Sequence, residues 1–204
     1  MRHRAVAFQV TLWALVGVGM TGLAVGRSVS AAKRQPLPVY GTVPAFALRD
    51  QAGRDMTHKD LDGAIWVADF IFTSCAGQCL LMSDQMRALQ RGFAGEPSLR
   101  FVSFSVDPLH DTPERLASYA QGYGSDARWV LLTGDPAQIR SVSMDGFHLA
   151  IAERPGAAHE PIVHSVRFVL IDRHRRIRGY YNATDSRAMS RLRQDARQLI
   201  QQEE

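Results

Sequence analysis

The hydrophobic positions of the chain form two kinds of segment that alternate along it. Runs that are almost wholly apolar, such as residues 64–72 and 129–133, are typical of strands buried inside a sheet. In residues 80–93 and 186–200, apolar side chains recur every three or four positions, which predicts amphipathic helices. A further strand is predicted at residues 99–106.

Helix starts and a hairpin complete this order of elements. The sequence Asp-Thr-Pro-Glu at 111–114 and the pair Asp135 and Pro136 each place a capping side chain ahead of a proline, which predicts the start of a helix. Runs at 166–171 and 176–181 flank a polar turn and predict a hairpin. Strands that alternate with helices predict an α/β architecture built around a central sheet.

Residues 1–34 differ in composition from the rest of the chain. The residues Arg2, His3 and Arg4 precede a stretch of 22 residues, 5–26, without any charged side chain. At about 1.5 Å per residue, such a helix would be roughly 33 Å long, enough to cross a bilayer. We therefore predict a single-pass transmembrane helix in preference to a cleaved signal peptide, whose apolar part is ordinarily shorter. Both alternatives place residues 35–204 outside the cytoplasm, and an anchored protein would sit in the cytoplasmic (inner) membrane with this domain in the periplasm or an equivalent space.

The net charge of +4 comes mainly from these first residues. They hold five Lys or Arg and no Asp or Glu, so removing their five charges leaves −1 on the other 170 residues. A nearly neutral domain is not what nucleic-acid binding requires, and we predict no nucleic-acid partner. Residues 35–204 are numerous enough to form one domain with its own core.

Two cysteines, Cys75 and Cys79, lie where the apolar run at 64–72 gives way to the helical pattern. Positions four apart on a helix lie on the same side, so thiols at the helix entrance would be held together. Such a pair could form a disulfide or clamp a soft metal ion. A bridge across four residues closes a tiny loop that constrains the unfolded chain little, which argues against a purely structural disulfide.

Three motifs carry a resemblance to a known family. They are Phe-Ile-Phe-Thr-Ser-Cys-x-x-x-Cys at 70–79, Ser-Val-Asp-Pro-x-x-Asp-Thr-Pro-Glu at 105–114, and His-Ser at 164–165 ahead of a strand ending Leu-Ile-Asp at 170–172. In this order, and with the predicted anchor, they resemble the SCO/SenC family over about residues 43–198. Members of that family are membrane-anchored, copper-binding proteins that help to assemble the CuA centre of cytochrome c oxidase. The resemblance implies a thioredoxin-like fold for residues 35–204, with a central mixed sheet flanked by helices.

By this resemblance, Cys75, Cys79 and His164 are the ligands of one copper ion. The donor chemistry agrees, because thiolates select Cu(I) and an added imidazole gives a site that also accepts Cu(II). A helix N-terminus is expected to lower the pKa of nearby thiols towards the thiolate that a metal needs. The implied function is a copper chaperone for the CuA site, and the implied partner is apo subunit II of cytochrome c oxidase or another copper-site protein.

The chain departs from the family pattern close to these ligands. Ala76 and Leu80 stand where the family usually has a proline after each cysteine, and Val163 stands where it usually has an aspartate. None of the three changes removes a ligand. The missing aspartate does remove a side chain that could orient the imidazole.

Two other functions compete with copper delivery. A thiol–disulfide oxidoreductase would use Cys75 and Cys79 as a redox pair to reduce the cysteines of the target before metal loading. Three residues separate these cysteines, whereas thioredoxins have two, which counts against a general reductase. A peroxidase that uses Thr73 and Cys75 is disfavoured, because the chain lacks the upstream Pro and Thr of such enzymes. Whether the protein is an enzyme therefore depends on how it uses the thiol pair.

Overall fold

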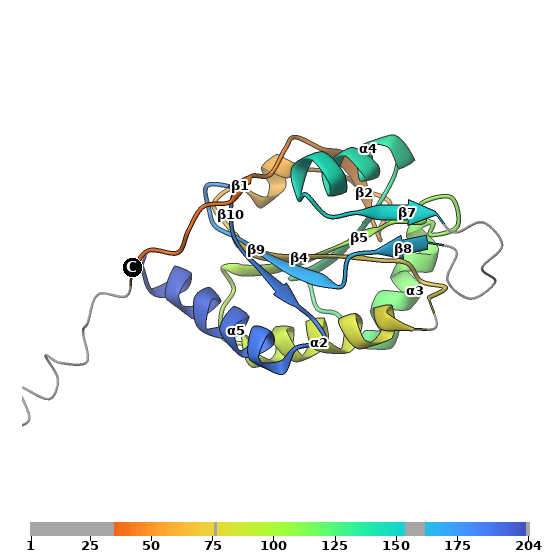
Figure 1. Cartoon of the computed structure of the whole chain (residues 1–204). Coiled ribbons are helices and arrows are strands. Elements are labelled where there is room, and N and C mark those ends of the chain that lie inside the picture. The colour runs from red at the N-terminus through yellow and green to blue at the C-terminus, as the bar shows by residue number, and fades with distance from the viewer. Residues whose placement is uncertain (1–34, 76, 154–161, 203–204) are drawn as a thin grey trace, which may run out of the picture. The chain divides into compact units, whose positions relative to one another are not determined.

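The computed structural model describes residues 35–75, 77–153 and 162–202, and its elements alternate along the chain (Figure 1). The strands are β1 (Gly41–Thr42), β2 (Ala47–Asp50), β3 (Asp55–Thr57), β4 (Ile65–Ile71), β5 (Leu99–Ser105), β6 (Trp129–Thr133), β7 (Ile151–Glu153), β8 (Ile162–His164), β9 (Arg167–Ile171) and β10 (Arg176–Asn182). The helices are η1 (His58–Leu61), α2 (Gln78–Gly92), α3 (Pro113–Tyr123), α4 (Pro136–Ser141), η2 (Val142–Gly146) and α5 (Ser186–Gln201).

Eight of the described strands form one mixed sheet in the order β1-β10-β9-β4-β5-β6-β2-β3. Its central strands β4, β5 and β6 run parallel, with Phe70 opposite Phe104 and Phe104 opposite Leu132. On the other side of β4, β9 runs antiparallel and places Ile171 opposite Trp66. The remaining described strands, β7 and β8, pair with each other. Strand β4 therefore ends between a parallel and an antiparallel neighbour.

The core of the domain is built around β4, in which all seven residues are buried. Phe70 of β4 stacks on Phe104 of β5 with ring centroids 5.1 Å apart. Phe147, just after η2, packs against both rings at 5.6 and 5.8 Å. Burial of large aromatic rings is a main source of stability, so this cluster fixes the strand from which the cysteine loop departs.

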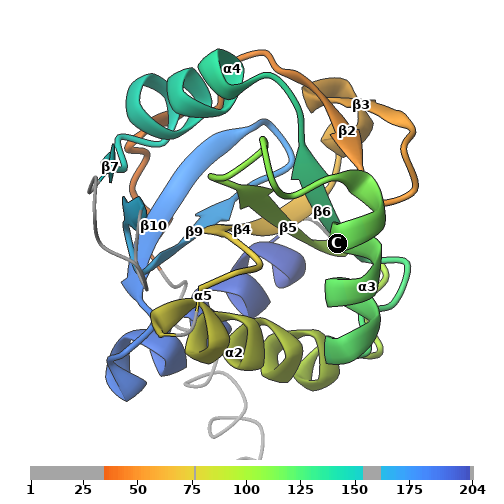
Figure 2. The same cartoon turned by 90° about the vertical axis from the view of Figure 1, so that its right-hand side faces the viewer.

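Helices cover both faces of the sheet (Figures 1 and 2). Helices α2 and α5 lie on one face, and α4 lies on the other. Helix α2 buries Met82, Met86 and Leu89, and α5 buries Met189 and Leu192. A strand covered on both sides must be apolar on both sides, which explains the continuous apolar run of β4.

The prediction of an α/β architecture with a central mixed sheet is confirmed, and the structure adds detail. The helix predicted from Pro136 ends at Ser141 and continues as the π-helical turn η2. The pair β7 and β8 was not predicted, because each of its strands is only three residues long. None of the described helices is long and apolar enough to cross a membrane. The anchor predicted at 1–34 lies outside the described residues.

Candidate metal centre

Sheet topology brings three separate chain segments together at one end of β4. Parallel strands end at the same edge of a sheet, so the segments that follow β4 and β5 are neighbours there, and the Val106 N–H donates to the Ile71 carbonyl at 2.8 Å. The antiparallel partner β9 begins where β4 ends. Continuing the register beyond Ala68, which lies opposite Val169, brings Ser165 opposite Phe72. His164 therefore meets the loop that carries the cysteines.

Cys75 and Cys79 are both free thiols and both buried, with 6% and 0% of their surface exposed. Cys75 lies in the loop that follows β4, and its N–H donates to the Phe72 carbonyl at 3.3 Å. Cys79 lies in the first turn of α2, which begins at Gln78. One thiol is thus held by a loop and the other by a helix.

His164 is in hydrogen-bond contact with Cys79, since the Cys79 Sγ lies 3.0 Å from the imidazole Nε2. The other ring nitrogen, Nδ1, lies 3.1 Å from the carbonyl oxygen of Ser165, which can only accept, so Nδ1 carries the proton. In the neutral ring Nε2 is then an acceptor, and it receives the Cys79 S–H. Phe72 packs edge-on against the ring at 5.8 Å. The lone pair of Nε2 therefore points at the sulfur, as a metal ligand would need.

Burial raises the pKa of the Cys79 thiol well above its ordinary value. The neighbouring Cys75 thiol and the charge of Asp69 raise the pKa further, and the Phe72 N–H only partly opposes them. The expectation that the helix N-terminus lowers the pKa is therefore wrong for Cys79 in the metal-free protein. A thiol with this pKa is protonated at neutral pH, which agrees with its role as the donor to His164.

The structure brings together part of the predicted ligand set. Cys79 and His164 are in contact, and the Cys75 thiol lies near enough to Cys79 to raise its pKa. Among the described residues, however, no three His, Cys, Asp or Glu side chains form a ready metal-binding group.

Asp69 is a buried carboxylate close to this site that sequence reasoning missed. It is wholly buried in β4, and neither carboxylate oxygen has a hydrogen-bond partner of normal geometry among the described residues. Burial raises the pKa of Asp69 to about 7, and Ser103, its register partner on β5, opposes this only in part. One acidic residue inside an otherwise apolar run was the sequence signal that could have identified it.

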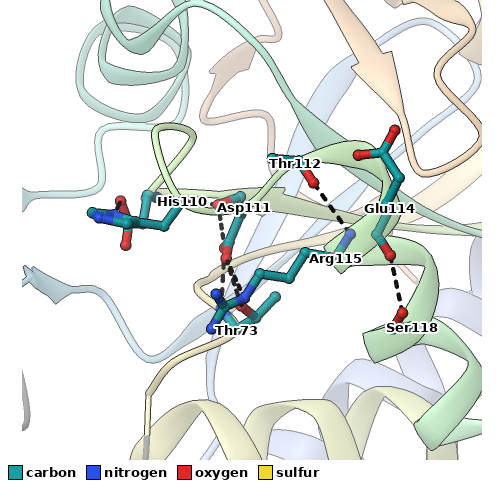
Figure 3. Close-up of polar contacts among 9 residues, drawn as sticks. Thr73, His110, Asp111, Thr112, Glu114, Arg115 and Ser118 are labelled. Atoms are coloured by element: carbon teal, nitrogen blue, oxygen red, sulfur yellow. Dashed lines mark hydrogen bonds and ion pairs between the residues drawn. The ribbon is translucent and has the colours of Figure 1, made fainter.

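Asp111 is a second buried carboxylate near this site, and sequence reasoning gave it no role beyond its place in a helix-start motif. The helix start is confirmed, with Thr112 as the N-cap of α3, whose hydroxyl accepts from the Arg115 N–H at 3.4 Å. Asp111 instead points towards Thr73, two residues before Cys75 (Figure 3). His110 points away from this cluster and lies 2.8 Å from the Asp107 carboxylate.

Comparison with known proteins identifies solved structures with the same fold. A SCO1/SenC family lipoprotein from Bacillus anthracis has a TM-score of 0.74 and 32% identity, with 83% of this chain and 99% of that chain covered. BsSco, described as a member of the Sco family of cytochrome c oxidase assembly proteins, has a TM-score of 0.71 and 28% identity over 82% of this chain and 99% of that chain. ScoI of Bradyrhizobium japonicum, solved with copper bound, has a TM-score of 0.60 and 25% identity over 76% of this chain and 99% of that chain. The fold is therefore the mixed α/β, thioredoxin-like fold of these proteins.

Sequence comparison gives the same family. A SCO1 protein homolog of Bacillus subtilis is 32% identical over 152 residues, which cover 73% of this chain and 78% of that protein. The family model described as SCO1/SenC matches residues 35–201, which include both cysteines, Asp111 and His164. The chain therefore belongs to the SCO1/SenC family.

Proposed function

We propose that this protein is a membrane-tethered copper chaperone that binds one copper ion through Cys75, Cys79 and His164. The observation that carries the proposal is the 3.0 Å contact between the Cys79 Sγ and His164 Nε2, with Nδ1 turned away to the Ser165 carbonyl. A ring bound in this way presents one nitrogen to a metal and fixes the other through a backbone acceptor. The Ser165 carbonyl thus supplies the orientation that the family's usual aspartate would give.

The donor set suits copper as cargo. Two thiolates favour soft Cu(I), and the imidazole nitrogen extends the site to Cu(II). ScoI of Bradyrhizobium japonicum has been solved with copper bound, and we propose that this chain binds copper as well. Because the Cys79 thiol is protonated in the metal-free protein, copper entry must displace its proton to solvent.

Delivery would proceed by ligand exchange. Thiolates of the acceptor would replace His164 and then the two cysteines. Each ligand that leaves the copper ion would be replaced by one from the acceptor, so that the ion is coordinated at every step. The acceptor we propose is apo subunit II of cytochrome c oxidase at its CuA site, or another copper-site protein, in line with the assembly role described for BsSco. The predicted anchor at 1–34 would hold domain 35–204 at the outer face of the inner membrane.

Copper binding by the full chain, reduced and purified in mild detergent, tests the proposal. Wild type should bind one equivalent of Cu(I), and Cys75→Ser, Cys79→Ser and His164→Ala should each bind much more weakly while keeping the wild-type far-UV circular dichroism. His174→Ala is a matched control, because this histidine lies in the hairpin turn after β9. Copper affinity that is unchanged in His164→Ala would rule out the proposed coordination.

A second candidate function is reduction of the acceptor's cysteines before metal loading. The observation that favours it is that Cys75 and Cys79 are both free thiols and that Cys75 lies near enough to Cys79 to raise its pKa. Together they could give up two electrons and two protons and close a disulfide, leaving the target as a dithiol. If the reduced chain, with no copper present, converts an acceptor disulfide to thiols faster than Cys75→Ser and Cys79→Ser do, the pair acts as a reductase.

A further inference from the structure

Asp111 lies outside the proposed ligand set, yet its carboxylate is wholly buried and accepts hydrogen bonds from two different segments. From the cysteine loop, the Thr73 N–H donates to Oδ2 at 3.0 Å and the Thr73 hydroxyl donates to Oδ1 at 2.5 Å. From the end of β5, the Ser105 hydroxyl donates to Oδ2 at 2.6 Å. One carboxylate therefore ties the segment after β4 to the end of β5.

Asp111 itself is held by hydrogen bonds within its own turn. The Asp111 N–H donates to the Asp107 carbonyl at 2.8 Å, and the Asp107 N–H donates to the Ser105 hydroxyl at 3.1 Å. Helix α3, which begins at Pro113, continues from this turn. Because backbone hydrogen bonds and a helix start surround Asp111, its carboxylate is a fixed point from which Thr73 is held.

Arg115 closes the cluster from the first turn of α3. Its Nε–H donates to the Thr73 hydroxyl oxygen at 2.7 Å and lies 3.9 Å from the Asp111 Oδ1 (Figure 3). A buried carboxylate is costly unless it is hydrogen-bonded and paired with a cation, and this one has both. The Thr73 hydroxyl therefore accepts from Arg115 while it donates to Asp111, so that the three side chains depend on one another.

We propose that Asp111 is a positioning residue that, through Thr73, fixes Cys75 opposite Cys79 and His164. Thr73 is two residues before Cys75, whereas Cys79 is held independently by α2. Loss of the Asp111 link would free Cys75 but leave the contact between Cys79 and His164 in place. Both reactions that need the two sulfurs together, copper binding and disulfide formation, would then become less favourable.

The test compares Thr73→Val and Asp111→Asn with two matched variants in the full chain. Thr73→Val keeps the shape and the N–H of Thr73 but removes its hydroxyl, and Thr73→Ser restores that hydroxyl. Asp111→Asn keeps the shape but removes the charge and one acceptor. Ser118→Ala, on the same helix, removes a hydroxyl that donates to the Glu114 carbonyl at 3.0 Å and is not part of the Asp111–Thr73–Arg115 cluster.

Two readouts are measured on each variant. Copper affinity for Thr73→Val and Asp111→Asn should fall roughly tenfold or more, as for other residues that orient metal ligands. In a glutathione buffer, oxidised glutathione accepts two electrons and two protons from Cys75 and Cys79 and leaves as two thiols while the protein disulfide forms. For both variants the midpoint potential of this pair should rise by about 30 mV, the equivalent of a tenfold less stable disulfide. Thr73→Ser and Ser118→Ala should stay at the wild-type values in both measurements.

The outcomes separate this inference from the proposed function, on which its copper readout rests. If wild type binds no copper, the proposed function fails, and the midpoint potentials still decide the role of Asp111. If Thr73→Val and Asp111→Asn lower only the melting temperature and leave both the potential and the copper affinity unchanged, the positioning role is refuted. If Asp111→Asn does not fold, Thr73→Val alone, measured against Thr73→Ser, gives the same decision.

Discussion

Replacing Asp69 by asparagine should change how the stability of the protein depends on pH. Asp69 is wholly buried in β4, and burial raises its pKa from 3.8 to about 7. Asparagine has nearly the same shape and no charge at any pH. Cys79, whose thiol is influenced by Asp69, has a raised pKa and stays protonated below neutral pH, so it does not titrate in the same range.

The direction in which stability changes with pH follows from the raised pKa of Asp69 in the folded state. Between pH about 4 and 7 the folded protein keeps a proton on Asp69 that the unfolded chain has lost. The stabilisation from this proton is therefore fully present below pH 4, falls as the pH rises, and is lost above pH 7. About three pKa units at about 1.4 kcal/mol each give roughly 4 kcal/mol as the upper limit of this change.

Urea unfolding of the reduced, metal-free chain, followed by tryptophan fluorescence between pH 4.5 and 8, measures the effect. The free energy of unfolding of Asp69→Asn minus that of wild type should rise with pH by up to about 4 kcal/mol and then level off above pH 7. The subtraction cancels the histidines and other groups that titrate alike in both proteins. Asp55→Asn, at an exposed position of β3, is the control and should give a flat difference. A flat difference for Asp69→Asn would contradict this prediction, because it would mean that Asp69 is ionised in the folded protein throughout this range.

Two further predictions concern charge pairing and copper uptake. Asp172 is buried and accepts from Arg178 at 2.6 Å and from Arg176 at 2.8 Å, so Asp172→Asn should lower the free energy of unfolding by about 3–5 kcal/mol. Asp55→Asn, which breaks only an exposed contact to Arg49, should cost less than about 1 kcal/mol; equal losses in urea unfolding would contradict this. Because copper displaces the Cys79 proton, Cu(I) affinity should rise at least about tenfold per pH unit between pH 6 and 8, measured against a colorimetric chelator; an affinity independent of pH would contradict that displacement.

Local patterns were sufficient to predict most of the fold. The apolar run that became β4 and the helical spacing of Met82, Met86 and Leu89 in α2 are properties of short stretches of sequence. The contact between Cys79 and His164, which lie 85 positions apart in the chain, is different, because it depends on β9 pairing antiparallel with β4. Nothing local to His164 predicts that pairing, so the sequence suggested this neighbour only through its resemblance to the family.

The orientation of the buried Asp111 carboxylate could not be predicted from the residues next to it in the sequence. The sequence at 111–114 has every feature of a helix cap, and the helix does start there, at Pro113. Whether Asp111 caps that helix or turns to Thr73 depends on β4 and β5 ending side by side, which is a property of the folded sheet. The prediction of a lowered pKa for the Cys79 thiol was wrong for a related reason, because it took no account of burial. A helix dipole contributes about 0.3–1 kcal/mol, whereas full burial can shift a pKa by several units and therefore outweighs it.

The same burial bears on the choice between copper delivery and disulfide reduction. A nucleophilic attack on a disulfide needs a thiolate, and for Cys79 a bare anion in a buried site next to Asp69 is strongly disfavoured. A copper ion that takes the place of the Cys79 proton brings its own positive charge, so that the sulfur becomes anionic only when it is already compensated. The imidazole lone pair that accepts the thiol proton would bind the copper ion once that proton leaves. The electrostatics of Cys79 and His164 therefore favour a metal ligand over a nucleophile, and a reductase would have to begin its reaction at Cys75.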